Sequence, residues 1–305
     1  MPPETITIAT DPDWLTTLTW VWLALALPIA ICLCFINAPY GRHNQGTWGP
    51  LISARSGWLL MESPAVIVPA GAFVWVRGWE SPVMLMFFLI WQAHYLHRAW
   101  IYPFRRARTS SPMPVLLMLM GLAFNLINGS LQGAWLFIHP TIDSSAWLGN
   151  WRFVTGSMVF GIGLVINMDS CNRLLRLRRE NPGEYSIPGG GMFRWVSCPN
   201  YLGEIVEWIG WALLTWSPAG LAFAAWTMAN LVPRARAHHR WYRERFPDYP
   251  AQRKALVPGL FCAPGQARRL PWPRAVDTLR RSCVCWIAIS FESGSFRSSF
   301  VCPGL

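Results

Sequence analysis

Long runs of apolar residues, separated by shorter polar segments, fill most of the chain up to residue 232. The runs cover residues 14–36, 58–76, 82–97, 113–138, 151–168 and 202–232. A helix needs about 20 apolar residues to cross a bilayer, and most of these runs approach or exceed that length. The last run is long enough for two short spans around Pro218. The pattern therefore predicts an all-α integral membrane protein, multi-pass, with seven transmembrane helices.

Arginine is distributed unevenly among the segments between these runs. Loops 98–112 and 173–200 are rich in arginine, whereas residues 1–13 and loop 139–150 contain no Lys or Arg. Basic and non-basic loops alternate along the chain, as the positive-inside rule expects. We therefore expect the N-terminus to lie outside and the C-terminus in the cytoplasm.

The composition agrees with a membrane protein and limits the range of partners. Apolar residues make up 53% of the chain and charged residues 13%, which is about half the charged fraction of a soluble domain. The net charge of +11 lies mainly in the predicted cytoplasmic loops, where it serves topology and contacts with anionic headgroups. We expect a monomer that contacts membrane lipids and binds no nucleic acid.

The cysteines and histidines predict no metal site. The eight cysteines include no CxxC pair. His94 and His97 are close in sequence, as are His238 and His239, but neither pair has a third ligand nearby.

Residues 1–261 form one predicted membrane domain. Within it, residues 180–193 read as a Gly/Pro-rich loop and residues 233–254 as a polar, basic helix followed by a turn. Beyond it the chain is rich in Arg, Ser, Cys and Pro without sustained periodicity. The one apolar run there, residues 283–291, is too short to span a bilayer. We expect residues 262–305 to be a basic, disordered extension.

Three polar residues occupy one helical face at the start of the last apolar run. Asn200, Glu204 and Glu207 follow one another at i, i+4 and i+7. The residues that follow, 208–232, carry no charge. An ionised carboxylate beside such a segment costs free energy near a bilayer, so two of them at this position indicate a functional role. They could instead satisfy the first turn of the helix, but an amide together with two acids favours a ligand site.

A second polar pair is predicted at a similar depth on the same side of the membrane. Glu62 lies four residues into the second run, about 6 Å deep at 1.5 Å per residue. Tyr95 lies near the end of the third run, which crosses in the opposite direction. A tyrosine and a carboxyl group in a dry pocket can donate a proton or hydrogen bond to a carbonyl oxygen. The alternative is a structural Glu62–Arg98 pair, with Tyr95 at the membrane interface.

Groups suited to a nucleotide continue toward the cytoplasm. Asn167, Cys171 and Arg178 share a helical face; an amide suits a ribose or another amide, and an arginine suits a phosphate. His238 and Tyr242 are stacked at i, i+4 among arginines. A stop-transfer cluster and a solvated face explain the arginines but not Asn167 at membrane depth. The chain has no P-loop and no dinucleotide fingerprint, so helices and loops would have to hold any nucleotide.

Several short motifs occur in order, with compatible spacing, between residues 30 and 261. They include Trp58-Leu-Leu-Met-Glu-Ser-Pro64, His94-Tyr-Leu-His-Arg98, Asn128-Gly-Ser-Leu-Gln-Gly133 and Cys198-Pro-Asn-Tyr-Leu-Gly-Glu204. This set resembles the steroid 5α-reductase family, although Asn-Tyr-x-Gly-Glu alone also occurs in related membrane reductases and methyltransferases.

The resemblance implies a seven-helix membrane reductase that takes NADPH from the cytoplasmic side and reduces the C4–C5 double bond of 3-oxo-Δ4-steroids. By position, Glu62 and Tyr95 would bind the 3-keto oxygen and polarise the enone, so that hydride reaches C5 and a proton reaches C4. The residues that would hold the cofactor are Arg98, Arg108, Asn167, Arg178, Asn200, Glu204, His238 and Tyr242.

Two positions depart from the family pattern. Met61 stands where Gln usually precedes the acid of the second span, which removes one polar contact to the substrate. Cys171 stands where an Asp is common, and the neighbouring Asp169 points elsewhere on the helix. One cofactor hydrogen bond is therefore in question.

Three other functions stay open at this point. A related membrane reductase of enoyl or polyprenoid lipids would share the cofactor residues, so only a substrate assay separates it. A methyltransferase of the isoprenylcysteine type would bind S-adenosylmethionine and leave Glu62 and Tyr95 without a purpose. A transporter or lipid-binding protein would place ionisable residues along a continuous path, whereas here they cluster at the cytoplasmic third of the spans.

Overall fold

The computed structural model describes part of the chain: residues 13–35, 49–105, 112–142, 144–181 and 184–257. These residues lie within one compact unit, Met1–Cys262. The predicted extension at 262–305 and the predicted cofactor residue Arg108 lie outside the described residues.

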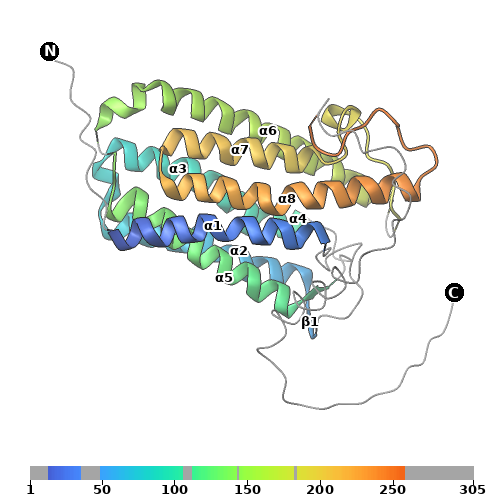
Figure 1. The fold of residues 1–305 in the computed structure, drawn as a ribbon, viewed down its shortest axis with the longest axis horizontal. Coiled ribbons are helices and arrows are strands. Elements are labelled where there is room, and N and C mark those ends of the chain that lie inside the picture. Colours follow the sequence, from blue (N-terminus) through green and yellow to red (C-terminus); the bar gives the residue numbers. More distant parts are fainter. Residues whose placement is uncertain (1–12, 36–48, 106–111, 143, 182–183, 258–305) are drawn as a thin grey trace. The chain divides into compact units, whose positions relative to one another are not determined.

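The fold is a bundle of long helices that run side by side (Figure 1). The long helices are α1 (Asp13–Phe35), α2 (Ala54–Trp75), α3 (Pro82–Tyr95), α5 (Val115–Gly133), α6 (Trp151–Glu180), α7 (Pro199–Thr215) and α8 (Pro218–Arg245). Strands β1 (Leu51–Ile52) and β2 (Met113–Pro114) pair antiparallel and tie together the starts of α2 and α5. The all-α prediction is confirmed for the described residues, and the break at Pro218 falls between two helices as expected.

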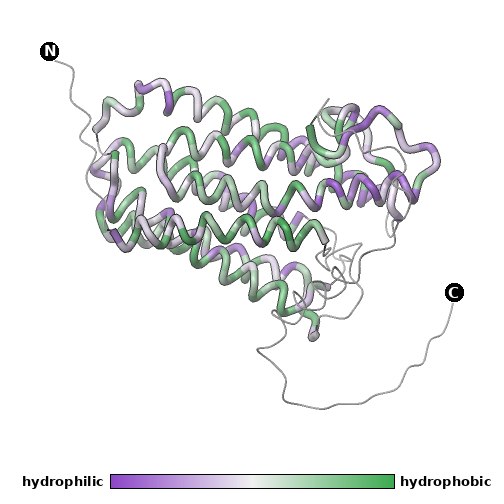
Figure 2. Tube along the Cα trace, in the orientation of Figure 1, coloured by the Kyte–Doolittle hydropathy of each residue, from purple (hydrophilic) through white to green (hydrophobic). Residues whose placement is uncertain are grey.

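Four helical segments in the described part of the chain are long and apolar enough to cross a membrane: Asp13–Cys34, Ala54–Trp75, Val115–Ile138 and Trp151–Glu180. Many of their apolar side chains face outward, as Trp75 at 82% exposure and Val165 at 67% illustrate. Figure 2 shows hydrophobic residues along the bundle and hydrophilic ones toward the end of α8. These features mark a membrane protein. Helices α3 and α7 have 14 and 17 residues, fewer than the 18 taken as the minimum for a candidate span. A count of seven spans therefore stays a prediction.

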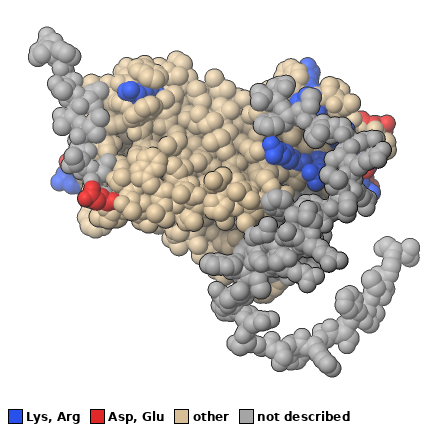
Figure 3. Space-filling model, viewed as in Figure 1, with Lys and Arg blue, Asp and Glu red and all other residues tan. Residues whose placement is uncertain are grey.

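Lys and Arg gather at the end of the bundle where α6 and α8 finish (Figure 3). Arg178 and Arg179 lie in the last turn of α6, and Arg243 and Arg245 in the last turn of α8. This is the side that the alternation of basic loops assigns to the cytoplasm.

Two helices run further than the sequence pattern predicts. The basic segment from residue 233 is the continuation of α8 rather than a helix of its own, and Pro233 is buried inside it. Proline removes a backbone hydrogen bond, but Leu231 and Ala235 on either side pack into an apolar cluster with Cys198 and Leu256, which offsets that loss. Helix α3 likewise continues through a π-helix, Leu96–Ile101, into α4 (Tyr102–Arg105). These three consecutive elements are called the third rod below.

Glycines bring the backbones of α6 and α7 into direct contact. A Cβ atom at Gly163 of α6 would lie 2.3 Å from the Glu207 backbone nitrogen, and one at Gly203 of α7 would lie 2.4 Å from that of Asn167. Such distances leave no room for a side chain, so small residues are required where the two helices meet. The close approach brings Asn167 beside the polar face of α7.

Aromatic side chains fill the core between α3, α7 and α8. Trp91, Trp208 and Trp211 are almost completely buried and lie within 5.2–6.4 Å of one another, centroid to centroid. Phe223 of α8 closes the cluster, 4.3 Å from the Trp208 ring. This packing holds Tyr95, one turn beyond Trp91, at the edge of the polar groups described next.

Candidate active site

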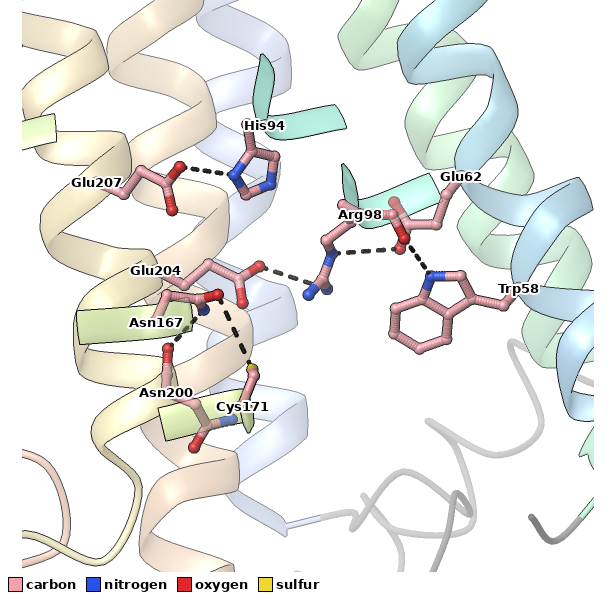
Figure 4. A network of polar contacts seen from close by, with 9 residues as sticks. All are labelled: Trp58, Glu62, His94, Arg98, Asn167, Cys171, Asn200, Glu204 and Glu207. Carbon is pink, nitrogen blue, oxygen red and sulfur yellow. Dashed lines mark hydrogen bonds and ion pairs between the residues drawn. The ribbon is translucent and has the colours of Figure 1, made fainter. Parts of the chain in front are cut away.

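Arg98 lies between two carboxylates from different helices (Figure 4). Its Nε is 3.8 Å from Glu62 Oε1 on α2, and its Nη2 is 3.4 Å from Glu204 Oε1 on α7. The Arg98 side chain is 26% exposed, and the two carboxylates are 9% and 14% exposed. The ion pair weighed from the sequence as an alternative is therefore present, and it joins α2 to α7 through the third rod.

The π-helix explains how Arg98 is presented. A π-helical turn widens the backbone ladder and often marks a functional site. The Arg98 carbonyl oxygen accepts a hydrogen bond from Trp58 Nε1 at 3.0 Å, and its guanidinium carbon lies 5.1 Å from the centre of the Trp58 ring. One tryptophan thus fixes both the backbone and the side chain of Arg98.

Tyr95 is the last residue of α3 and is only 3% exposed. Its ring lies 4.6 Å from that of Trp91 and 5.7 Å from that of Trp208. It is therefore not an exposed residue of the membrane interface. Among the described residues no hydrogen bond joins Tyr95 to Glu62, so the Glu62 carboxylate does not occupy the Tyr95 hydroxyl.

A second polar group joins α6 to α7. Asn167 Nδ2 donates to the backbone oxygen of Asn200 at 2.9 Å, while its Oδ1 lies 3.9 Å from Cys171 Sγ. Figure 4 shows these residues beside Glu204. The stripe predicted on α7 and the amide predicted on α6 therefore meet in space.

A small cavity opens between these two groups. It is lined by His94, His97, Arg98, Tyr102, Leu164, Asn167 and Cys171. Residues from the third rod form one wall and residues from α6 the other. Cys171, the departure from the family pattern, lies on the wall of this cavity, where it offers a thiol in place of a carboxylate.

The remaining predicted residues make contacts of their own near the basic end of the bundle. Arg178 is exposed, with its guanidinium carbon 4.3 Å from the centre of the Tyr185 ring. His238 Nε2 lies 3.2 Å from the Tyr201 hydroxyl. Tyr242 is buried and its ring stacks on Tyr249 at 5.4 Å.

Three contacts at the site were not among the predicted pairs. Trp58 holds Arg98, Tyr201 holds His238, and His94 Nδ1 lies 2.6 Å from Glu207 Oε1. That last pair gives Glu207 a partner on α3, so its carboxylate is engaged within the bundle. Only Trp58 offered a signal, since it stands one turn before Glu62; the other pairs join segments far apart in sequence. In the described parts of the chain no cluster of metal ligands occurs.

A polar cluster outside the membrane-spanning segments links α8 to the chain that follows it. Ser197 Oγ lies 2.6 Å from His239 Nδ1 and 2.6 Å from the Tyr249 hydroxyl. Burial, with Arg243 and Lys254 nearby, lowers the pKa of His239 below its ordinary value. The neutral form of the imidazole is therefore favoured, and its Nδ1 shares a hydrogen bond with Ser197 Oγ, whose hydroxyl also donates to the Lys254 carbonyl oxygen at 3.1 Å.

We expect this cluster to make stability sensitive to acid. A histidine whose pKa is lower in the folded state contributes stability above its unfolded pKa of about 6.5, and that stability is lost as the pH falls below it. Thermal unfolding should show a lower Tm at about pH 5.5 than at about pH 7.5, and His239→Gln should flatten this dependence. His139→Gln, at the other end of the bundle, serves as the control. An unchanged pH dependence in His239→Gln would contradict the assignment.

Comparisons with known proteins show which family this chain is similar to. Residues 111–261 match the family model described as 3-oxo-5-alpha-steroid 4-dehydrogenase. The chain is 43% identical over 234 residues to steroid 5-alpha-reductase DET2 of Arabidopsis thaliana, covering 74% of this chain and 89% of that protein. It is 37% identical over 230 residues to the human 3-oxo-5-alpha-steroid 4-dehydrogenase 1, covering 74% and 87%.

A bovine relative with the same name as the human one is 38% identical over 232 residues, covering 74% of this chain and 88% of that protein. These matches favour a reductase over the methyltransferase and transporter alternatives. The chain belongs to the steroid 5-alpha-reductase family, whose members are oxidoreductases that act on CH–CH bonds of steroids.

Proposed function

We propose that this protein reduces the C4–C5 double bond of 3-oxo-Δ4-steroids with NADPH from the cytoplasmic side of the membrane. The observation that carries the proposal is the network of buried Glu62 with partly buried Arg98 and Glu204, beside Tyr95, in a membrane protein of this family. Ionised groups inside a membrane bundle are costly and mark functional sites.

Tyr95 and Glu62 are assigned to the 3-keto oxygen. The Tyr95 hydroxyl lies in an aromatic, almost dry environment, where a hydrogen bond to a developing oxyanion is worth more than in water. Glu62 is 3.8 Å from Arg98, beyond hydrogen-bond range, and Asn125 is a hydrogen-bond partner of its carboxyl group. We assign the remaining hydrogen-bonding capacity of this carboxyl group to a proton shared with the ketone and Tyr95. Together they polarise the enone toward attack at C5.

The residues beside the cavity fit a nicotinamide cofactor. Asn167, Asn200 and Glu204 combine amide and carboxylate groups that can satisfy a carboxamide, and Arg98 adds a positive charge. Arg178, with its exposed guanidinium packed on Tyr185, suits a phosphate at the cytoplasmic end. When bound, NADPH supplies the hydride. The chain's own part is to hold it, exclude water and polarise the ketone.

An absorbance assay tests the proposed activity. Purified protein in detergent or nanodiscs is incubated with testosterone or progesterone and NADPH, and the loss of the conjugated-enone absorbance is followed. We expect loss of that absorbance with consumption of one NADPH per steroid. Absence of any change with 3-oxo-Δ4-steroids, together with turnover of another lipid enone, would favour the enoyl or polyprenoid reductase instead.

Arg178→Ala is expected to raise the KM for NADPH about tenfold while leaving kcat nearly unchanged, because it removes a charge-assisted contact made equally in the ground and transition states. Steady-state kinetics with varied NADPH measure the effect. Arg176→Ala, a neighbouring arginine on the same helix, is the matched control and should keep the KM of the unmodified protein. A KM unchanged in Arg178→Ala would exclude Arg178 from the cofactor site.

A further inference from the structure

His94 and Glu207 form a buried pair beyond the Arg98–Glu204 pair, toward the middle of the bundle (Figure 4). His94 Nδ1 lies 2.6 Å from Glu207 Oε1, and the two residues are 4% and 0% exposed. The second carboxylate oxygen, Oε2, is buried without a hydrogen-bond partner among the described residues. A carboxylate so enclosed is costly unless a positive charge accompanies it.

The pair also fixes the orientation of the imidazole. Glu207 occupies Nδ1, and the rings of Tyr95 and Trp208 lie 5.0 and 4.7 Å from the His94 ring in edge-on contact. Figure 4 shows the other ring nitrogen, Nε2, turned away from Glu207. Because His94 lines the cavity beside Arg98 and Asn167, its second ring nitrogen, Nε2, is the one positioned to serve that space. A carboxylate behind a histidine has the same orienting effect in hydrolase triads.

Two other donors that line the cavity, Arg98 and His97, are already engaged, whereas the remaining ones, Tyr102 and Cys171, are a phenol and a thiol. Arg98 is held between two carboxylates and stays protonated at any ordinary pH. His97 Nε2 lies 3.2 Å from Arg105 Nη1 and accepts from it. Tyr95 is assigned to the ketone. The charged or titratable groups that act on this part of the bundle come from several elements: Glu62 on α2, Tyr95, His97 and Arg98 on the third rod, Cys171 on α6, and Glu204 and Glu207 on α7.

We propose that His94, oriented by Glu207, donates the proton that C4 of the steroid takes up. This rests on the proposed function. Hydride addition at C5 moves the double-bond electrons onto C4 and the 3-keto oxygen as an enolate. The new C4–H bond forms with the proton from Nε2 as its N–H bond breaks, and the enolate returns to the ketone. His94 is left neutral and regains a proton from water on the cytoplasmic side. His94 is thus a catalytic residue and Glu207 a positioning residue.

Glu207→Gln and His94→Gln test this assignment, with Glu207→Asp as the conservative variant and His139→Gln as the control. Glu207→Gln keeps the size of the side chain and removes its charge. We expect kcat to fall about a hundredfold in both glutamine variants, as for loss of a general acid. The KM values should stay within about twofold of those of the unmodified protein. The solvent deuterium isotope effect on kcat should increase, and Glu207→Asp should recover part of the rate.

The contact between His94 and Glu207 is measured separately from turnover by ¹⁵N NMR of histidine-labelled protein, with the signal assigned by its loss in His94→Gln. We expect the ¹⁵N shifts of the His94 ring to differ between the unmodified protein and Glu207→Gln, because the carboxylate that holds Nδ1 is removed. Unchanged His94 shifts in Glu207→Gln, or full turnover by both glutamine variants with an unchanged isotope effect, would overturn the role of His94 alone. A properly folded protein that reduces no enone at all would instead overturn the proposed function and this inference together.

Discussion

Tyr95→Phe is expected to lower kcat for 3-oxo-Δ4-steroids by about 100- to 1,000-fold, the usual effect of removing one hydrogen-bond donor to a developing oxyanion. The phenyl ring keeps the contacts with Trp91 and Trp208, so the core and the NADPH affinity should change little. Single-turnover kinetics and NADPH titration separate the two effects. Full activity in Tyr95→Phe would exclude the electrophilic role.

Glu62→Gln is the companion to that experiment. It is expected to abolish most turnover as well, because the amide cannot transfer a proton to the ketone or to Tyr95. It also removes one of the two carboxylates that hold Arg98, so NADPH binding must be measured in the same preparation. An unchanged affinity for NADPH with lost turnover would assign Glu62 to the substrate side of the site.

Gly203→Ala is expected to damage both folding and activity. Its Cβ would lie 2.4 Å from the backbone nitrogen of Asn167 and 2.7 Å from the Gly163 carbonyl oxygen, and neither backbone atom can move without separating α6 from α7. Overpacking of this kind costs about 1–3 kcal/mol or more. The same separation would pull Asn167 from Asn200. We therefore expect a lower Tm in detergent and a weaker affinity for NADPH.

Gly161→Ala is the matched control for that prediction. Gly161 lies on the same helix as Gly163, and a methyl group added there would meet no heavy atom within 4 Å among the described residues. Alanine also has the higher helix propensity. The Tm and NADPH affinity of this variant should equal or exceed those of the unmodified protein. Equal behaviour of Gly203→Ala and Gly161→Ala would contradict the role of glycine in the helix contact.

Much of the helical layout follows from local pattern. Apolar runs predicted the helices because a membrane segment must satisfy its backbone internally, and the i, i+4 spacing correctly placed Asn200 and Glu204 together. Their positions in the first turns of α7 are consistent with a ligand-facing stripe. The continuation of α8 through Pro233 was not predictable in this way, because it depends on packing against Cys198 and Leu256, which are distant in sequence.

The ion pairs at the site required the folded structure. Arg98 was assigned to the cofactor by resemblance, yet the charged groups that it contacts among the described residues are Glu62 and Glu204. The position of Arg98 depends on the π-helix after Tyr95, and the hydrophobic periodicity of the sequence does not predict a π-helix there. The pairing of His94 with Glu207 joins residues 113 positions apart. Glycine spacing on α6 and α7 offered a signal for their close contact, but only once the two helices were known to be neighbours.

The central claim is that hydride is delivered to C5 of an enone whose ketone is held by Tyr95 and Glu62. Turnover of a 3-oxo-Δ4-steroid with NADPH that carries deuterium at its transferable position tests it most directly, with the product analysed by mass spectrometry and NMR. We expect one deuterium at C5, a hydrogen from water at C4 and an intact 3-keto group. Deuterium at C3 of an alcohol, which would mean reduction of the carbonyl itself, would contradict it.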